Sequence, residues 1–128
     1  MDSRAAKTKL KKHLDKYKAD ENFVITETLA LYWWRVINRA AFNGKMETPK
    51  YFDIRGMRGY WGECQGYITG EVKISVNEAI LNRELLIATI AHEMVHQWQW
   101  ENYKKMNHTD SHYRRWSRKF KKEFGIGI

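Results

Sequence analysis

The chain contains one cysteine, Cys64, and one proline, Pro49. A single cysteine excludes an intrachain disulfide and a four-cysteine zinc ribbon, and its thiol is expected to be buried and inert. No window reaches the roughly 18 uninterrupted apolar residues that cross a bilayer. The basic N-terminus lacks the apolar run of a secretion signal. These absences predict an intracellular, cytoplasmic protein that makes no membrane contact.

Signals for a domain boundary are missing as well. No repeat and no Ser/Gly-rich linker interrupts the 128 residues, and this length suits one domain. Apolar residues make up 43% of the chain and charged residues 30%, as is typical of a globular protein. We therefore expect residues 1–128 to form a single, monomeric domain.

The net charge of +8 is concentrated at the two ends of the chain. Residues 1–20 carry a net +4 and residues 101–128 carry a net +5, so the middle is close to neutral. Basic surfaces attract polyanions, nucleic acid above all. Basic residues also alternate with aromatic ones in Tyr113–Trp116, a combination that suits phosphate contact and base stacking. The charge predicts nucleic-acid contact through the basic termini, unless these side chains only solvate exposed helix faces.

Periodicity divides the chain into helical ends and a middle of strands. Helical spacing predicts a basic helix over about 4–19, a helix after Thr26 to about 42, a long helix over about 83–103, and a last helix over 111–124 capped by Asp110 or Ser111. Between the second and third helices, β-branched and aromatic stretches separated by glycines predict an antiparallel meander over 50–55, 60–64, 67–69 and 71–76. The sequence thus predicts an α+β fold, with a small antiparallel sheet of about three strands packed against about four helices.

The third long helix carries the motif His92–His96, with sequence HEMVH. Residues four apart lie on the same face of a helix, so the imidazoles of His92 and His96 can reach one metal ion. Neutral imidazole suits Zn²⁺. Between them, Glu93 is placed to take a proton from water that the zinc has made more acidic. The motif predicts a zinc metallopeptidase of the zincin type, with Glu93 as general base.

A third ligand must come from elsewhere in the chain. His13 lies in the basic N-terminal segment, where a solvated side chain is expected, which leaves His108 and His112. His112 falls in the first turn of the last helix, a rigid position, and His108 in the loop before that helix. The spacing favours His112 but leaves both open, and Asp110 is a candidate to orient a ligand through a hydrogen bond.

Over residues 26–124 the sequence resembles the SprT-like (Spartan-type) metallopeptidase family, whose eukaryotic member cleaves proteins crosslinked to DNA. The resemblance rests on the motif Ala91–His96 and on His112 followed by aromatic residues within a helix. It also rests on Gly62–Cys64 in the meander and on the strand ending in Ile74–Asn77. It implies a zincin-like fold and a zinc site of His92, His96 and His112.

Together, motif and resemblance predict a zinc-dependent endopeptidase, acting on proteins associated with or crosslinked to DNA. In such a fold an extended substrate peptide adds to the edge of a strand beside the motif helix, and 71–76 is the expected strand. The alternative from another class is a nucleic-acid-binding or scaffold module with a structural or catalytically silent zinc. Glu93 argues against that alternative, because a purely structural site needs no base.

Overall fold

The computed structural model describes residues 2–16 and 23–128. The described residues form helices and strands in the order α1 (Ser3–Lys16), α2 (Glu27–Phe42), β1 (Tyr51–Arg55), β2 (Gly62–Gly66), β3 (Val72–Asn77), α3 (Arg83–Tyr103) and α4 (Ser111–Phe124). The expected extension of the first helix through 17–19 lies outside the described residues, as does the side chain of His13. No helix in this part of the chain is both long and apolar enough to cross a membrane.

Side-chain caps fix where three of the helices begin. Thr26 accepts a hydrogen bond from the backbone N–H of Leu29, Asn82 from that of Leu85, and Asp110 from that of Tyr113. Each bond satisfies an N–H group that has no partner within its helix. At the other end of α2, Asn43 takes the left-handed conformation with φ of 55°, which turns the chain out of the helix. These local signals account for the agreement between the expected and observed bounds of α2, α3 and α4.

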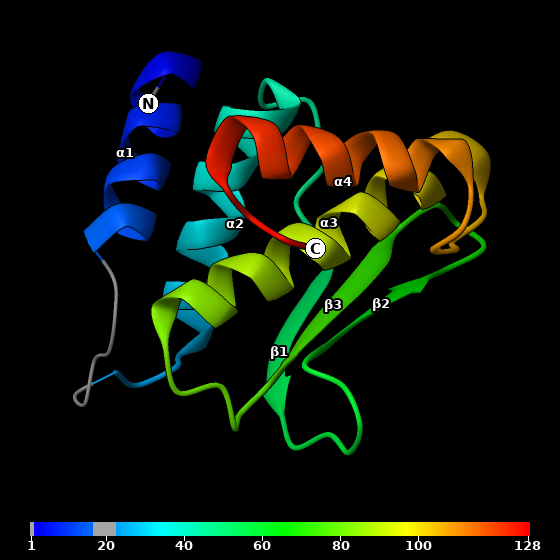
Figure 1. Cartoon of the computed structure of the whole chain (residues 1–128). Helices are drawn as coiled ribbons and strands as arrows, with labels where there is room; N and C mark the ends of the chain where they lie inside the picture. The colour runs from blue at the N-terminus through cyan, green and yellow to red at the C-terminus, as the bar shows by residue number, and fades with distance from the viewer. Residues whose placement is uncertain (1, 17–22) are drawn as a thin grey trace.

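The helices gather on one face of the sheet, and α3 runs along it (Figure 1). On this side α3 contacts β2 and β3, while α2 contacts both α3 and β1. Outside these, α1 packs against α2, and α4 packs against α3. The core between them is built from large side chains that are fully buried: Trp33, Trp34, Ile37, Ile74, Leu86, Ile87, Ile90, Met94 and Phe120.

The sheet is mixed, with strand order β1-β3-β2, and is not the antiparallel meander expected from the sequence. β2 and β3 form an antiparallel hairpin, whereas β1 pairs with β3 in parallel. The expected stretch 67–69 is part of the hairpin turn, in which Gly70 donates to the carbonyl of Tyr67 at 2.8 Å. The connection after β1 passes β3 before the chain turns back, so β3 becomes the central strand.

The central position of β3 corrects a further expectation. The strand is not an edge available to a peptide, because it is paired on both sides. Much of the strand is covered on both faces, because Ser75 is 1% exposed and Asn77 is 5% exposed, on the face opposite the buried Ile74 and Val76. The Asn77 amide donates to two carbonyls of the loop between β1 and β2, at 2.9 and 3.0 Å. Among the described strands β2 lies at the edge beside α3.

Two glycines let the backbone of β2 approach α3 closely. A Cβ atom at Gly66 would lie 2.3 Å from the ring of Trp100, and one at Gly62 would lie 2.6 Å from the Thr89 side chain. The indole N–H of Trp100 donates to the carbonyl of Tyr67 at 3.1 Å, so its ring is tied to the turn beyond β2. β2 is therefore held directly against the helix that carries the histidine motif.

Replacing Gly66 with Ala should destabilise the fold by about 1–3 kcal/mol, because the added methyl group overlaps the fixed Trp100 ring. Gly127→Ala is the matched control, since a Cβ there meets nothing within 4 Å. Urea unfolding of both variants measures the difference. Equal stability of Gly66→Ala and the unaltered protein would show that the strand and helix are not in tight contact.

Candidate metal centre

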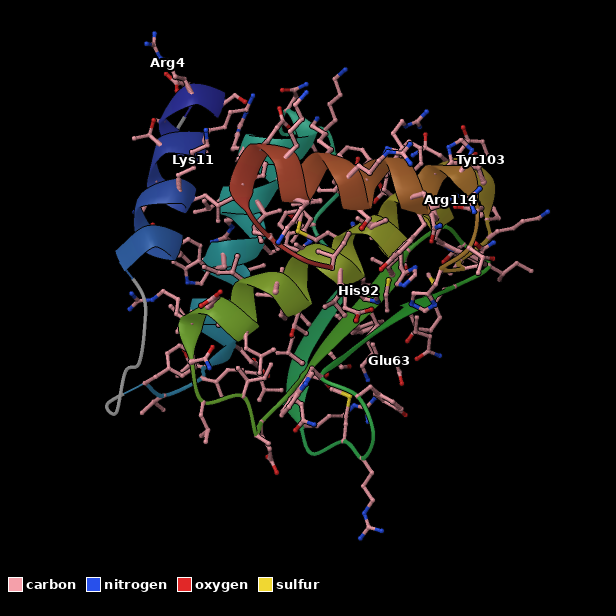
Figure 2. All side chains as sticks on the ribbon, viewed as in Figure 1. Arg4, Lys11, Glu63, His92, Tyr103 and Arg114 are labelled. Atoms are coloured by element: carbon pink, nitrogen blue, oxygen red, sulfur yellow. The ribbon has the colours of Figure 1, made fainter. Side chains whose placement is uncertain are left out.

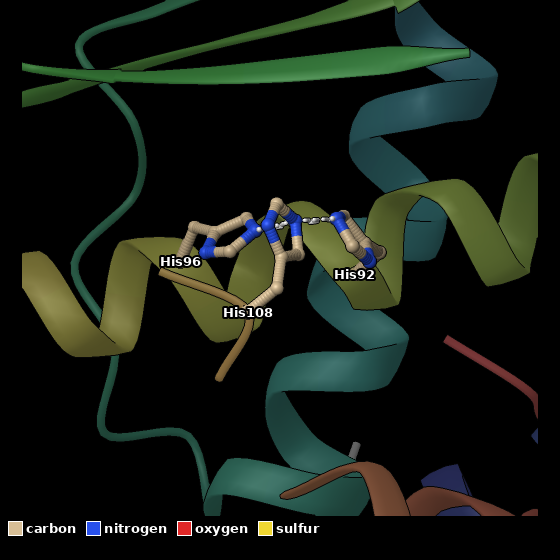
Figure 3. A group of neighbouring side chains, drawn as sticks. All are labelled: His92, His96 and His108. Carbon is tan, nitrogen blue, oxygen red and sulfur yellow. Dashed lines mark hydrogen bonds between the residues drawn. The ribbon is translucent and has the colours of Figure 1, made fainter. Parts of the chain in front are cut away.

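Three imidazole rings meet in a cleft beside α3. His92 and His96 stand one turn apart on the helix, and His108 reaches them from the loop between α3 and α4 (Figure 3). Their Nε2 atoms form a triangle, with separations of 3.2 Å for His92–His96, 3.0 Å for His96–His108 and 3.2 Å for His92–His108. The same nitrogen of each ring faces the common centre.

This triangle fits a cation better than it fits a set of hydrogen bonds. Each Nε2 has either one proton or one lone pair in a neutral ring, so three mutual contacts cannot all be hydrogen bonds. Three ligands held tetrahedrally at 2.0–2.1 Å from zinc lie about 3.3–3.4 Å apart, within a few tenths of an ångström of the observed separations. The donor set, three neutral imidazoles, also suits zinc, with further positions left open.

The electrostatics of the site keep these rings in the form that binds metal. Burial lowers the pKa of His92 to about 4, with further lowering by His96 and His108. Burial also lowers the pKa of His96. Both rings are therefore neutral near pH 7, with a lone pair free for a ligand bond.

The structure brings His108, and not His112, to the motif histidines. The ring of His112 stacks on Tyr103 with centroids 4.4 Å apart, lies 5.5 Å from Trp98, and has its Nδ1 3.2 Å from an Arg115 nitrogen. The structure thus places His112 away from the motif histidines, contrary to the expectation of a third ligand there, and His108, the alternative left open by the spacing, completes the candidate set.

The start of α4 explains this outcome. With Asp110 as its cap, α4 turns Tyr113 towards α3, where the hydroxyl lies 3.1 Å from Nδ1 of His92. His112, one residue earlier and so about 100° around the helix, points instead towards the C-terminal end of α3. One signal in the sequence could have indicated this placement of His112. The apolar stripe of α4 consists of Tyr113, Trp116, Phe120 and Phe124, and His112 lies at the margin of that stripe.

Glu93 lies in the same cleft and is 5% exposed. Its Oε2 is 4.0 Å from Nε2 of His92. Burial, and then the charge of Glu63, raise the pKa of Glu93 to about 8. This raised pKa applies to the metal-free site. A cation bound nearby would favour the charged carboxylate and so lower the pKa of Glu93.

A cavity of about 480 Å³ surrounds the three histidines. Its lining combines residues of β2 and the loop before it with residues of α3 and the loop after it: Tyr60, Gly62, Glu63, Cys64, His92, Glu93, His96, Met106, Asn107 and His108. A second cavity of about 310 Å³ shares His92 and Glu93 with the first and is walled mainly by apolar residues, including Trp61, Leu85 and Ala88.

The thiol of Cys64 is only partly exposed. Burial and the charge of Glu93 raise its pKa, which agrees with the inert thiol expected.

Sequence reasoning missed Gln99 altogether. Its side chain is buried, and its Oε1 lies 2.8 Å from Nδ1 of His96. Asp110, considered earlier as a direct partner of a ligand, instead accepts hydrogen bonds from Gln99 and from the Tyr113 backbone.

Fold and site together define a small α+β domain with a three-histidine candidate metal centre and a buried glutamate beside it. The model of the SprT-like family matches residues 30–127, and the chain belongs to this family. The resemblance drawn from the motif is thereby confirmed, and the membership indicates a domain of metallopeptidase type. No curated protein matched the chain by sequence.

Replacing His108 with Ala should lower zinc affinity on the order of 100-fold or more, because one of three ligand bonds is lost. His112→Ala should keep the affinity within a few-fold, since its ring packs on Tyr103. Competition with a chromophoric chelator measures both. Loss of zinc by the His112 variant, with retention by the His108 variant, would restore the assignment made from the spacing.

Proposed function

We propose that this protein is a zinc-dependent endopeptidase in which His92, His96 and His108 hold the metal. The observation that carries the proposal is the Glu93 carboxyl group, buried in the cleft where the three Nε2 atoms converge and 4.0 Å from one of them. A structural zinc site has no use for an acid placed there, so the alternative of a catalytically silent module is disfavoured. Membership of the SprT-like family supports the same conclusion.

Zinc bound by these histidines would supply Lewis acidity, which polarises a peptide carbonyl and makes water more acidic. The carboxylate of Glu93 accepts a proton from a water molecule while the oxygen of that water attacks the carbonyl carbon. The same carboxyl group can return that proton to the amide nitrogen as the C–N bond breaks. Hydrolysis of one peptide bond thus consumes one water and leaves Glu93 unchanged.

The surroundings of Glu93 suit an extended peptide. In the described sheet β2 is bonded to β3 alone, so its other edge has free N–H and C=O groups to which a peptide can add as a further strand. Gly62 opens that strand directly above Glu93, since a Cβ there would lie 2.9 Å from Oε2 of Glu93. The apolar cavity beside Glu93 then accepts a side chain next to the bond that is cut.

Glu93→Gln should reduce peptide hydrolysis by about 10²–10⁴-fold, because an amide cannot accept the proton from water. The change preserves the shape of the side chain, so zinc content should stay at about one ion per chain. The assay is cleavage of an unfolded protein or a quenched fluorescent peptide, with metal content measured on the same samples.

Glu84→Gln is the matched control, an exposed glutamate in the first turn of the same helix. It should leave the rate unchanged. Full activity of the Glu93 variant would refute the mechanism, and absence of activity in the unaltered, zinc-loaded protein would favour the silent module.

We further propose that the substrates are proteins associated with nucleic acid, contacted through the basic termini. The outward side of α4 carries five exposed cations, Arg114, Arg115, Arg118, Lys121 and Lys122. Helix α1, with Arg4 and Lys11 on its outer side, contacts α4 (Figure 2). The two basic ends of the chain therefore lie together, which strengthens their attraction for phosphate groups.

Binding to single- and double-stranded oligonucleotides should weaken steeply as salt is raised, because counterions are released from phosphates. Replacing both Arg118 and Lys122 with Gln should lower the salt slope by about 2 while zinc content is unchanged. Arg58→Gln, an exposed cation in the loop after β1, is the control. No binding at low salt, or a slope that the double variant does not alter, would dispose of this proposal.

A further inference from the structure

Gln99 is a buried amide, 1% exposed, one turn beyond His96 on α3. All of its polar atoms face the site and the loop that carries His108. Its Oε1 lies 2.8 Å from Nδ1 of His96 and accepts from the backbone N–H of Asn107 at 3.3 Å. Its Nε2 donates to the Asn107 carbonyl at 2.9 Å and to the Asp110 carboxylate at 3.2 and 3.3 Å.

These partners permit one orientation of the amide. Its amino end faces a carbonyl and a carboxylate, which only accept, and its oxygen faces a backbone N–H, which only donates. The atom of His96 beside that oxygen must therefore carry a proton. With the proton on Nδ1, the lone pair of His96 lies on Nε2, the atom that meets the other two rings.

The same amide also fixes the loop. It bonds both the N–H and the C=O of Asn107, the residue next to His108 in the chain. Asp110, its other partner, caps α4 through the N–H of Tyr113 at 2.7 Å, and the Tyr113 hydroxyl lies 3.1 Å from Nδ1 of His92. Through these hydrogen bonds Gln99 joins His96 on α3 to the loop that carries His108.

We propose that Gln99 is a positioning residue for the metal centre: it sets the tautomer of His96 and holds the His108 loop in reach of the motif. The inference rests on the proposed function, because it presumes that the three histidines bind zinc. Groups that orient ligand histidines in this way contribute to metal affinity without touching the metal.

Gln99→Met removes the hydrogen bonds and roughly keeps the side-chain volume. It should lower zinc affinity by about 10- to 100-fold and alter the visible spectrum of the cobalt-substituted protein, which reports ligand geometry. Zinc affinity is measured by chelator competition, and the stability of the metal-free protein by thermal unfolding.

Gln97→Met is the matched control. Gln97 is also fully buried on α3, but it bonds Trp34, the Glu47 carbonyl and Glu101 instead of the histidines. It should lower stability as much as the Gln99 change or more, while zinc affinity and the cobalt spectrum stay as in the unaltered protein. Wild-type affinity in Gln99→Met, or equal loss of affinity in both variants, would overturn the inference.

A measurement on the unaltered chain covers the case in which Gln99→Met does not fold. In the metal-free protein, the ¹⁵N shifts of His96 should show a protonated Nδ1 and an unprotonated Nε2. The opposite tautomer would overturn the inference. This result does not depend on zinc binding or on peptidase activity, so failure of the proposed function is seen separately, as no zinc uptake or no cleavage by the unaltered protein.

Discussion

The requirement that three imidazole nitrogens meet at one point governs the architecture around α3. One turn of helix supplies two of them, His92 and His96, with no demand on the rest of the fold. The third needs a chain that leaves α3 and returns beside it. The left-handed residue Lys104, with φ of 56°, ends the helix and begins that return, and Asp110 stops it by capping α4. The short loop between these two points places His108.

A site of this kind requires buried polar side chains close to the core of a small domain, and in this protein several of them lie on α3. Glu93, His96, Gln97 and Gln99 are all buried on this helix. Burying them without partners would cost several kcal/mol. Gln97 is bonded towards α2 and the loop before β1, and Gln99 towards the loop before α4. The two amides thereby connect α3 to its neighbours on opposite sides, and the three-histidine cluster lies between these connected elements.

The helices and the motif could be predicted from sequence because their signals are local. Thr26, Asn82 and Asp110 each cap the helix that follows, and the spacing of His92 and His96 is a property of one turn. Sheet order was not predictable in this way. β1 pairs with β3 instead of its sequence neighbour β2, and that choice depends on how the sheet packs under α3, for which no short-range pattern exists. The position of the third histidine was not predictable for a related reason: the spacing favours His112 in a helix over His108 in a loop, and the hydrogen bonds from Gln99 that hold this loop are not visible in the sequence.

The groups proposed for catalysis and those proposed for substrate recognition lie on different elements of the fold. The groups proposed for chemistry stand on α3 and the loop after it, held by Gln99 and Tyr113. The groups proposed for recognition stand on β2, the edge strand whose two glycines lie against α3, and on α4, whose exposed cations point outward. Asp110 both caps α4 and accepts a hydrogen bond from Gln99. The basic surface on α4 is therefore connected directly to the three-histidine cluster. A protein bound beside nucleic acid on that surface would meet a cleft whose position relative to α4 is set by the Asp110 cap.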